Sequence, residues 1–193
     1  MAGVVQLRSA ADVTAFIIAD PWRREVLDAV RRQCLPDWAI GAGFIRSPVW
    51  DALHNYAQPT PLPDVDVLFF DPSDLSQGYE AAIDAALGEA LPNILWSAKN
   101  QARMHLRNGD APYADTADAL RFWLETSTAV AIRTGDDAVA TLFAPFGVDD
   151  LLAMISRPTP SGQRRWPEYQ SRMRAKAWSA RWPRVRVLDA AFA

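Results

Sequence analysis

Cysteine and histidine are nearly missing from this chain of 193 residues. Cys34 is the single cysteine, which excludes an intrachain disulfide framework, and only two histidines are present, so no zinc-ligand spacing occurs. No uncharged apolar run approaches the ~20 residues that a membrane span needs. The N-terminal segment also lacks the basic-then-apolar pattern of a signal peptide. These absences lead us to expect a cytoplasmic protein with no membrane partner.

An excess of positive charge is missing as well. The formal net charge is −3, which gives no reason to expect a strong general attraction to nucleic acid. What the chain does contain is apolar surface, since half of its residues are hydrophobic and eight are tryptophan. At this length, that composition predicts one compact domain with a sizeable core.

The most informative stretch runs from Trp38 to Asp71. In it, an apolar strand leads into Gly41-Ala42-Gly43, and after a Pro-rich turn the segment Asp64-Val65-Asp66 opens a second apolar strand. Side chains alternate along a strand, so the two aspartates share one face. Two adjacent carboxylates repel each other unless a cation lies between them or one is protonated, and Mg²⁺ is the usual cation for an all-oxygen pair. The alternative is that the pair marks only a solvated strand end.

Two further groups of residues carry chemistry that suits phosphate. The Gly41–Gly43 turn leads straight into the N-terminus of a helix predicted over about 44–55, which carries unpaired N–H groups and partial positive charge. Arg46, in its first turn, would contact phosphate or form an ion pair with a carboxylate such as Asp51. Lys99 and Arg103 share a face whether their segment is a strand or turns helical at position 100. They would bind phosphate, pair with the two aspartates, or do both.

Periodicity and turn signals predict the remaining elements. The predicted helices cover about 9–20, 22–33, 75–91, 116–124 and 167–180, and a further helix begins at Asp149 and Asp150. The predicted N-caps are Ser9 for the first helix, Ser73 or Asp74 for the helix 75–91, and Thr116 for the helix 116–124. The predicted strands cover 38–41, the run after Asp64, 93–99, and a hairpin formed by 129–133 and 138–143. Residues 157–165 are predicted as a flexible basic loop. Basic and aromatic residues alternate in the last helix, which indicates either a structural edge or an RNA contact.

Five blocks of the chain resemble a bacterial nucleotidyltransferase-like family of the polymerase-β-type superfamily whose substrate is not established. They are GAGFIRSPVWDALH (41–54), DVDVLFFD (64–71), WSAKNQARMH (96–105), ETSTAVAIR (125–133) and APFGVDDLL (144–152). The resemblance implies an α/β (α+β) fold with a small mixed sheet, helices mostly on one side, and the aspartate strand central or next to central. It implies a single domain over 1–193, with a core at about 36–155 and a C-terminal helical extension at about 156–193.

The resemblance also implies an activity, which is transfer of a nucleoside monophosphate from a nucleoside triphosphate to an unknown hydroxyl acceptor. The acceptor would be a small molecule, a protein or RNA. Asp64 and Asp66 would hold Mg²⁺ or Mn²⁺ and carry catalysis. Gly41 and Gly43 would shape the phosphate turn, and Arg46, Lys99 and Arg103 would bind the triphosphate or the acceptor.

One position departs from the superfamily pattern. A third carboxylate is expected on the strand after the aspartate pair, and Ser97 stands where it would be, with no acid anywhere in 93–105. Glu125 would supply the missing acid from elsewhere in the fold, or would cap a helix or pair with Arg103. The competing hypothesis is a catalytically degenerate nucleotide-binding or partner-binding module with the same fold. RNA binding through the C-terminal basic segment is a third, weaker hypothesis.

Overall fold

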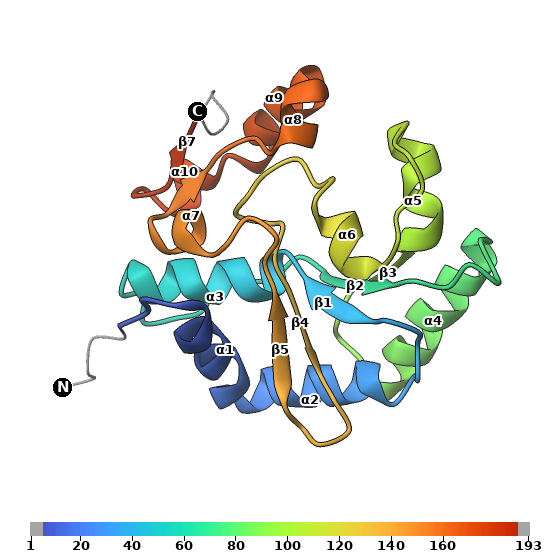
Figure 1. Cartoon of the computed structure of the whole chain (residues 1–193). Coiled ribbons are helices and arrows are strands. Elements are labelled where there is room, and N and C mark those ends of the chain that lie inside the picture. The colour runs from blue at the N-terminus through green and yellow to red at the C-terminus, as the bar shows by residue number, and fades with distance from the viewer. Residues whose placement is uncertain (1–5, 189–193) are drawn as a thin grey trace.

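A mixed sheet of five strands forms the centre of the computed structural model, which describes residues 6–188 (Figure 1). The strands are β1 (Ala39–Gly41), β2 (Val65–Phe69), β3 (Trp96–Asn100), β4 (Ala131–Thr134) and β5 (Ala140–Phe143), in the spatial order β3-β2-β1-β4-β5. β2 and β3 are parallel, and the other neighbouring pairs are antiparallel. The predicted small mixed sheet is therefore confirmed, with the aspartate strand β2 next to the centre. The ends of the predicted domain, 1–5 and 189–193, lie outside the described residues.

Helices surround this sheet on both sides, so the expectation that they would pack mostly on one side is wrong. In Figure 1, α1 and α2 lie below the sheet, whereas α8 and α9 lie above it. The helices are α1 (Ala10–Ala19), α2 (Pro21–Arg31), α3 (Gly43–Leu53), α4 (Gln77–Ala90), α5 (Gln101–Asn108), α6 (Thr116–Leu120), α7 (Asp149–Leu152), α8 (Pro160–Arg164), α9 (Trp166–Lys176) and α10 (Trp178–Arg181). The short strands β6 (Ile155–Ser156) and β7 (Arg186–Val187) pair in parallel beside α8 to α10. None of the helices between residues 6 and 188 has the length and apolar character to cross a membrane.

Side-chain caps set most helix boundaries. Ser9 accepts from the backbone N–H of Asp12 as predicted, and Asp20 caps α2 just before Pro21. Ser76, not Ser73 or Asp74, caps α4, and Asp115, not Thr116, caps α6. The predicted flexible loop 157–165 is largely helical, because Thr159 accepts from the N–H of Gly162 and starts α8.

The alternation predicted for β2 divides two apolar clusters. Val65, Val67 and Phe69 belong to the main core, which includes buried residues of α1 and α2. Leu68 faces the other way, into a small cluster with Ala39, Leu120 and Ala131. The small cluster does not fill the upper face of the sheet, and Asp66 lies on this face.

Helix α4 covers the open edge of β3 through two carboxylates. Asp84 accepts from the backbone N–H of Ala98 at 2.7 Å, and Glu80 accepts from the N–H of Asn100 at 2.8 Å. These bonds satisfy strand donors that have no strand neighbour, which protects the edge from pairing with other chains.

Candidate active site

The two predicted aspartates lie at the start of β2. Asp66 is within the strand and pairs in register with Ser97 of β3, and Asp64 comes just before the strand. Both side chains are half-buried, and neither forms an ion pair with any residue between 6 and 188. The two carboxylates are therefore partly desolvated, and neither has an ion-pair partner among the described residues.

The electrostatics of this pair are unfavourable without a cation. Burial raises the pKa of Asp66 to about 6, and the charge of Asp64 adds to the increase. Arg172, Arg46 and Lys176 oppose the increase, so these three cations lie near enough to act on Asp66. The pair thus retains the tendency to take up a proton or a metal ion.

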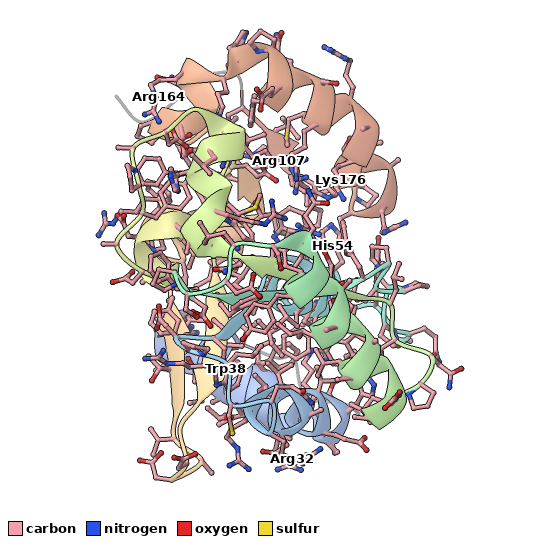
Figure 2. All side chains as sticks on the ribbon, turned by 90° about the vertical axis from the view of Figure 1, so that its right-hand side faces the viewer. Arg32, Trp38, His54, Arg107, Arg164 and Lys176 are labelled. Atoms are coloured by element: carbon pink, nitrogen blue, oxygen red, sulfur yellow. The ribbon has the colours of Figure 1, made fainter. Side chains whose placement is uncertain are left out.

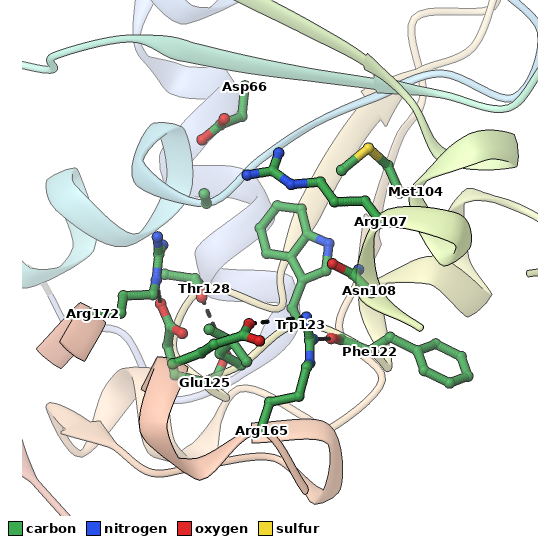
Figure 3. A pocket seen from close by; sticks show the side chains of 13 residues that line it. Asp66, Met104, Arg107, Asn108, Phe122, Trp123, Glu125, Thr128, Arg165 and Arg172 are labelled. Atoms are coloured by element: carbon green, nitrogen blue, oxygen red, sulfur yellow. Dashed lines mark hydrogen bonds and ion pairs between the residues drawn. The ribbon is translucent and has the colours of Figure 1, made fainter. Parts of the chain in front are cut away.

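Asp66 faces a cavity of about 500 Å³, which we call the Asp66 cavity (Figure 3). The β2 strand contributes Asp66, the β1–α3 turn contributes Ala42, and α5 contributes Arg107 and Asn108. The remaining wall comes from the segment after α6 and from the C-terminal helices, with the lining residues Phe122, Trp123, Leu124, Glu125, Thr128, Arg165, Glu168 and Arg172. Figure 3 shows Arg107 and Asp66 extending toward the same part of this cavity.

Glu125 lines the same cavity as Asp66 and lies between α6 and β4, where it forms an isolated β-bridge with Pro158. Its side chain is 1% exposed, and Oε1 accepts from Nε of Arg172 at 2.7 Å. Its second oxygen, Oε2, is buried without a hydrogen-bond partner among residues 6–188. The alternative partner Arg103 is bound to Glu80, so Glu125 pairs with Arg172 and not with Arg103.

The turn between β1 and α3 has its unusual backbone at Ala42 rather than at a glycine. Ala42 adopts φ 52° and ψ −117°, a strained conformation for a residue with a side chain, and its N–H donates to the carbonyl of Val130 at 3.0 Å. Gly41 and Gly43 serve close packing. A Cβ at Gly41 would lie 3.3 Å from the Val130 carbonyl oxygen, and one at Gly43 would lie 2.9 Å from Leu62.

Arg46 is buried, with 7% of its surface exposed, and its guanidinium lies 4.6 Å from the ring centroid of Trp178. It forms no ion pair within residues 6–188, and its Nε has no hydrogen-bond partner there. Burial lowers its pKa to about 10, while Glu125 and Asp66 favour its charged form. The alternative to a phosphate contact, an ion pair with Asp51, does not form, because Asp51 accepts from Thr60 and Trp182. A buried cation without a counter-ion is thus available near Asp66.

The other two predicted cations are engaged at the edge of the sheet. Arg103 donates to both oxygens of Glu80, at 2.8 and 2.6 Å, and lines neither of the cavities that Asp66 lines. The structure therefore contradicts the expected pairing of Arg103 with the aspartates and gives no support to its phosphate role. Lys99 lies 3.7 Å from Glu80 and also lines a small cavity of about 130 Å³ with Asp66.

The C-terminal helices supply the basic residues that the sequence reasoning did not assign to the site. Arg165, Arg172 and Lys176 recur at helical spacing, and this periodicity could have shown that they share one face. Figure 2 shows Arg107 of α5 and Lys176 of α9 in the same region of the molecule, above the sheet. Arg164 of α8 donates to Asp110, beyond α5, at 3.0 Å, and so connects the two sides of the Asp66 cavity.

The described residues contain no group of three or more acids, histidines or cysteines placed to hold a metal ion. A metal at Asp64 and Asp66 would therefore take two protein carboxylates and complete its coordination with water or substrate oxygens. Mg²⁺ commonly binds in this way, through one or two carboxylates plus phosphate oxygens. The unpaired carboxylates and the raised pKa of Asp66 fit such an ion.

Comparison with known proteins places this geometry in context. The chain is similar to a protein whose solution structure is described as revealing a CCA-adding enzyme head domain, with 28% identity, a TM-score of 0.86, and coverage of 97% of this chain and 100% of that chain. A Thermotoga maritima CCA-adding enzyme complexed with tRNA-CCA is 14% identical, with a TM-score of 0.56, and a structure of a tRNA-processing enzyme complex is 17% identical, with a TM-score of 0.51. This chain covers 43% of each of those two longer chains, and 95% and 85% of this chain are aligned. These two likenesses show a shared fold.

No curated protein matches the chain. A family model described as nucleotidyltransferase matches residues 28–187, which include the β1–α3 turn, both aspartates, Glu125 and the C-terminal helices. The match confirms the resemblance that the sequence blocks indicated, and because it spans most of the chain, this protein belongs to that nucleotidyltransferase family.

Proposed function

We propose that the protein transfers a nucleoside monophosphate from a nucleoside triphosphate to a hydroxyl acceptor, with Mg²⁺ or Mn²⁺ bound by Asp64 and Asp66. The observation that carries this proposal is the unpaired, half-buried aspartate pair beside a cavity with basic residues. Membership of a nucleotidyltransferase family supports it. The single cysteine and the substrates make the cytoplasm the proposed location.

The triphosphate would occupy the Asp66 cavity. Arg172 and Arg46 lie close to Asp66, and Arg107 lines the same cavity. Together with Lys176, they would offset the negative charge of the phosphates. The β1–α3 turn would bring backbone N–H groups toward phosphate at the start of α3. Lys99 remains a further candidate at the adjoining small cavity.

A bound divalent ion would neutralise charge on the phosphates and fix the orientation of the α-phosphoryl group. The residues of the chain would do the rest. Arg172, held in place by Glu125, would support the leaving pyrophosphate, and the walls of the Asp66 cavity would exclude water from the reacting phosphorus. The acceptor oxygen would form a bond to the α-phosphorus while the bond from that phosphorus to pyrophosphate breaks, and a carboxylate would take the hydroxyl proton. Glu125 is the proposed third acid.

A second candidate function is nucleotide binding without catalysis. Ser97 lies directly opposite Asp66 in the β2–β3 register, so the neighbouring strand supplies a hydroxyl where the superfamily pattern expects a carboxylate. If the third acid is essential and Glu125 cannot replace it, the protein would bind a nucleotide and signal its presence to a partner.

Titration of the purified protein with ATP, GTP, CTP and UTP, with and without Mg²⁺, tests both functions. We expect at least one triphosphate to raise the melting temperature only when Mg²⁺ is present. Release of pyrophosphate in the same samples would identify the enzyme, and binding without release would identify the module. The absence of any Mg²⁺-dependent response to all four triphosphates would refute the proposed site.

A further inference from the structure

A second cavity, of about 440 Å³, lies beside Asp64, and we call it the Asp64 cavity. Its walls come from the start of α2, the Pro-rich segment 59–63 and the segment 93–95 before β3. It shares no lining residue with the Asp66 cavity. Asp64 comes just before β2 and Asp66 lies within it, so two acids only two positions apart each line a different one of these cavities.

We propose that the Asp64 cavity binds the acceptor, and that the acceptor is a compact, hydroxyl-bearing molecule with an apolar ring and no phosphate. This inference rests on the proposed function. Nucleotidyl transfer needs two substrates to meet at the α-phosphorus, and an in-line attack brings the acceptor from the side opposite the leaving pyrophosphate. Helix α2, which contributes to the wall of the Asp64 cavity, lies below the sheet, and α9, which contributes to the wall of the Asp66 cavity, lies above it (Figure 1).

The walls of the Asp64 cavity suit an apolar ring. Trp22 is 39% exposed there, and the ring of Phe44 supports it from behind, with the ring centroids 6.1 Å apart. Leu95 is 68% exposed, and Leu62 and three prolines complete the apolar wall. A cavity of this size holds a small molecule, and an exposed indole offers a face on which a ring can stack.

The charges of the Asp64 cavity disfavour a phosphate-rich acceptor such as RNA. Among residues 6–188, Arg23 is the only cation that lines this cavity, and its guanidinium donates to Asp20 of the same cavity. Asp64 forms no ion pair with any of residues 6–188, so the wall carries one uncompensated negative charge. A neutral or cationic acceptor is therefore favoured over a polyanion. In the transfer step, the acceptor oxygen would form its bond to the α-phosphorus while the bond from that phosphorus to pyrophosphate breaks, and a carboxylate would take the hydroxyl proton, as in the proposed function.

The substitution Leu95→Arg should weaken the binding of a cationic acceptor and strengthen the binding of a polyanionic one, so it distinguishes the two kinds of acceptor. The Leu95 side chain is largely exposed, so the change places a cation in the cavity wall without disturbing the core. Leu106→Arg is the matched control, because Leu106 is 69% exposed and lines neither aspartate cavity. The probes are tyramine, a cationic aromatic molecule with a hydroxyl group, and the RNA octamer r(A)8. Binding is followed by saturation-transfer NMR for tyramine and by fluorescence anisotropy for labelled r(A)8, on the full chain.

We expect tyramine to bind the wild type and Leu106→Arg equally, and to bind Leu95→Arg at least about tenfold more weakly, because the new cation repels it. Equal binding of tyramine to wild type and Leu95→Arg, or no binding to the wild type, would overturn the inference. The inference would also be overturned if r(A)8 bound the wild type, and if it bound Leu95→Arg more tightly than the wild type while binding Leu106→Arg no more tightly.

Mg²⁺-triphosphate stabilisation, measured on the same variants, separates this inference from the proposed function. It should be unchanged in Leu95→Arg, since Leu95 lies outside the Asp66 cavity. If the wild type shows Mg²⁺-triphosphate stabilisation but tyramine binding does not depend on Leu95, only the acceptor assignment fails. If the wild type shows no response to any Mg²⁺-triphosphate, the proposed function fails, and the acceptor role fails with it.

Discussion

Replacing Asp66 with asparagine should stabilise the metal-free protein while removing its response to Mg²⁺. In the folded protein, burial and the charge of Asp64 make the ionised form of Asp66 unfavourable. Asparagine has nearly the same shape and carries no charge. Asp66→Asn therefore removes the repulsion and keeps the packing of β2, which the strand pattern and not the carboxylate maintains.

The size of this effect follows from the pKa of Asp66, which rises from 3.8 to about 6 on folding. Below about pH 4 both the folded and unfolded states hold the proton, so the carboxyl group costs nothing. As the pH rises from about 4 to 6, the unfolded state loses its proton first, and the free energy of unfolding of the wild type falls. The loss is complete by about pH 7, one unit above the folded-state pKa, and amounts to as much as about 3 kcal/mol. For a chain of this length, that corresponds to about 6–12 °C in melting temperature.

Thermal melts in EDTA between pH 4 and pH 8 measure this difference. We expect the Asp66→Asn curve to approach that of the wild type at pH 4 and to lie well above it at pH 7.5. Asp136→Asn, a change at an exposed carboxylate in the β4–β5 turn, should differ from the wild type by no more than about 0.5 kcal/mol at any pH. Adding MgCl₂ at pH 7.5 should raise the melting temperature of the wild type and leave that of Asp66→Asn unchanged.

Two results would refute this reasoning. If Asp66→Asn were no more stable than the wild type at pH 7.5 in EDTA, the ionised Asp66 carboxylate would not destabilise the folded protein as we propose. If Asp66→Asn bound Mg²⁺-triphosphate as tightly as the wild type, the assignment of the metal site would be wrong.

Three further predictions concern the surroundings of the pair. Arg172→Met leaves a buried carboxylate without its cation, so we expect a lower melting temperature and weaker Mg²⁺-triphosphate stabilisation; a loss of stability alone would assign Arg172 a structural role. Arg103→Met should cost about 3 kcal/mol of unfolding free energy, because buried Glu80 loses its bidentate partner and keeps only the more distant Lys99, yet the variant should keep the Mg²⁺-triphosphate response; loss of that response would assign Arg103 to the site. Ser97→Asp places a carboxylate opposite Asp66, and a pyrophosphate assay should detect a gain if only that acid is missing; an unchanged rate would show that another acid serves.

The amino-acid sequence by itself determined the local elements of this protein. The alternation after Asp64 predicted that Val65 and Val67 would face the main core, and the structure places them there. Likewise, the N-cap residue Ser9 and the Asp20–Pro21 boundary could be predicted, because such signals act over a few residues and need no knowledge of distant contacts. The family was also readable from the sequence blocks.

The partners of the charged residues were decided only by the tertiary structure. Arg172 meets Glu125 across 47 positions, and Arg103 meets Glu80 across 23. No periodicity within one helix or strand can choose between two acids that are both distant in sequence. The packing of α9 above the sheet and of α4 along the edge of β3 makes that choice, because burying a charge is tolerable only where the fold supplies its partner. The sequence therefore located the aspartate pair, and the three-dimensional packing selected the cations that surround it.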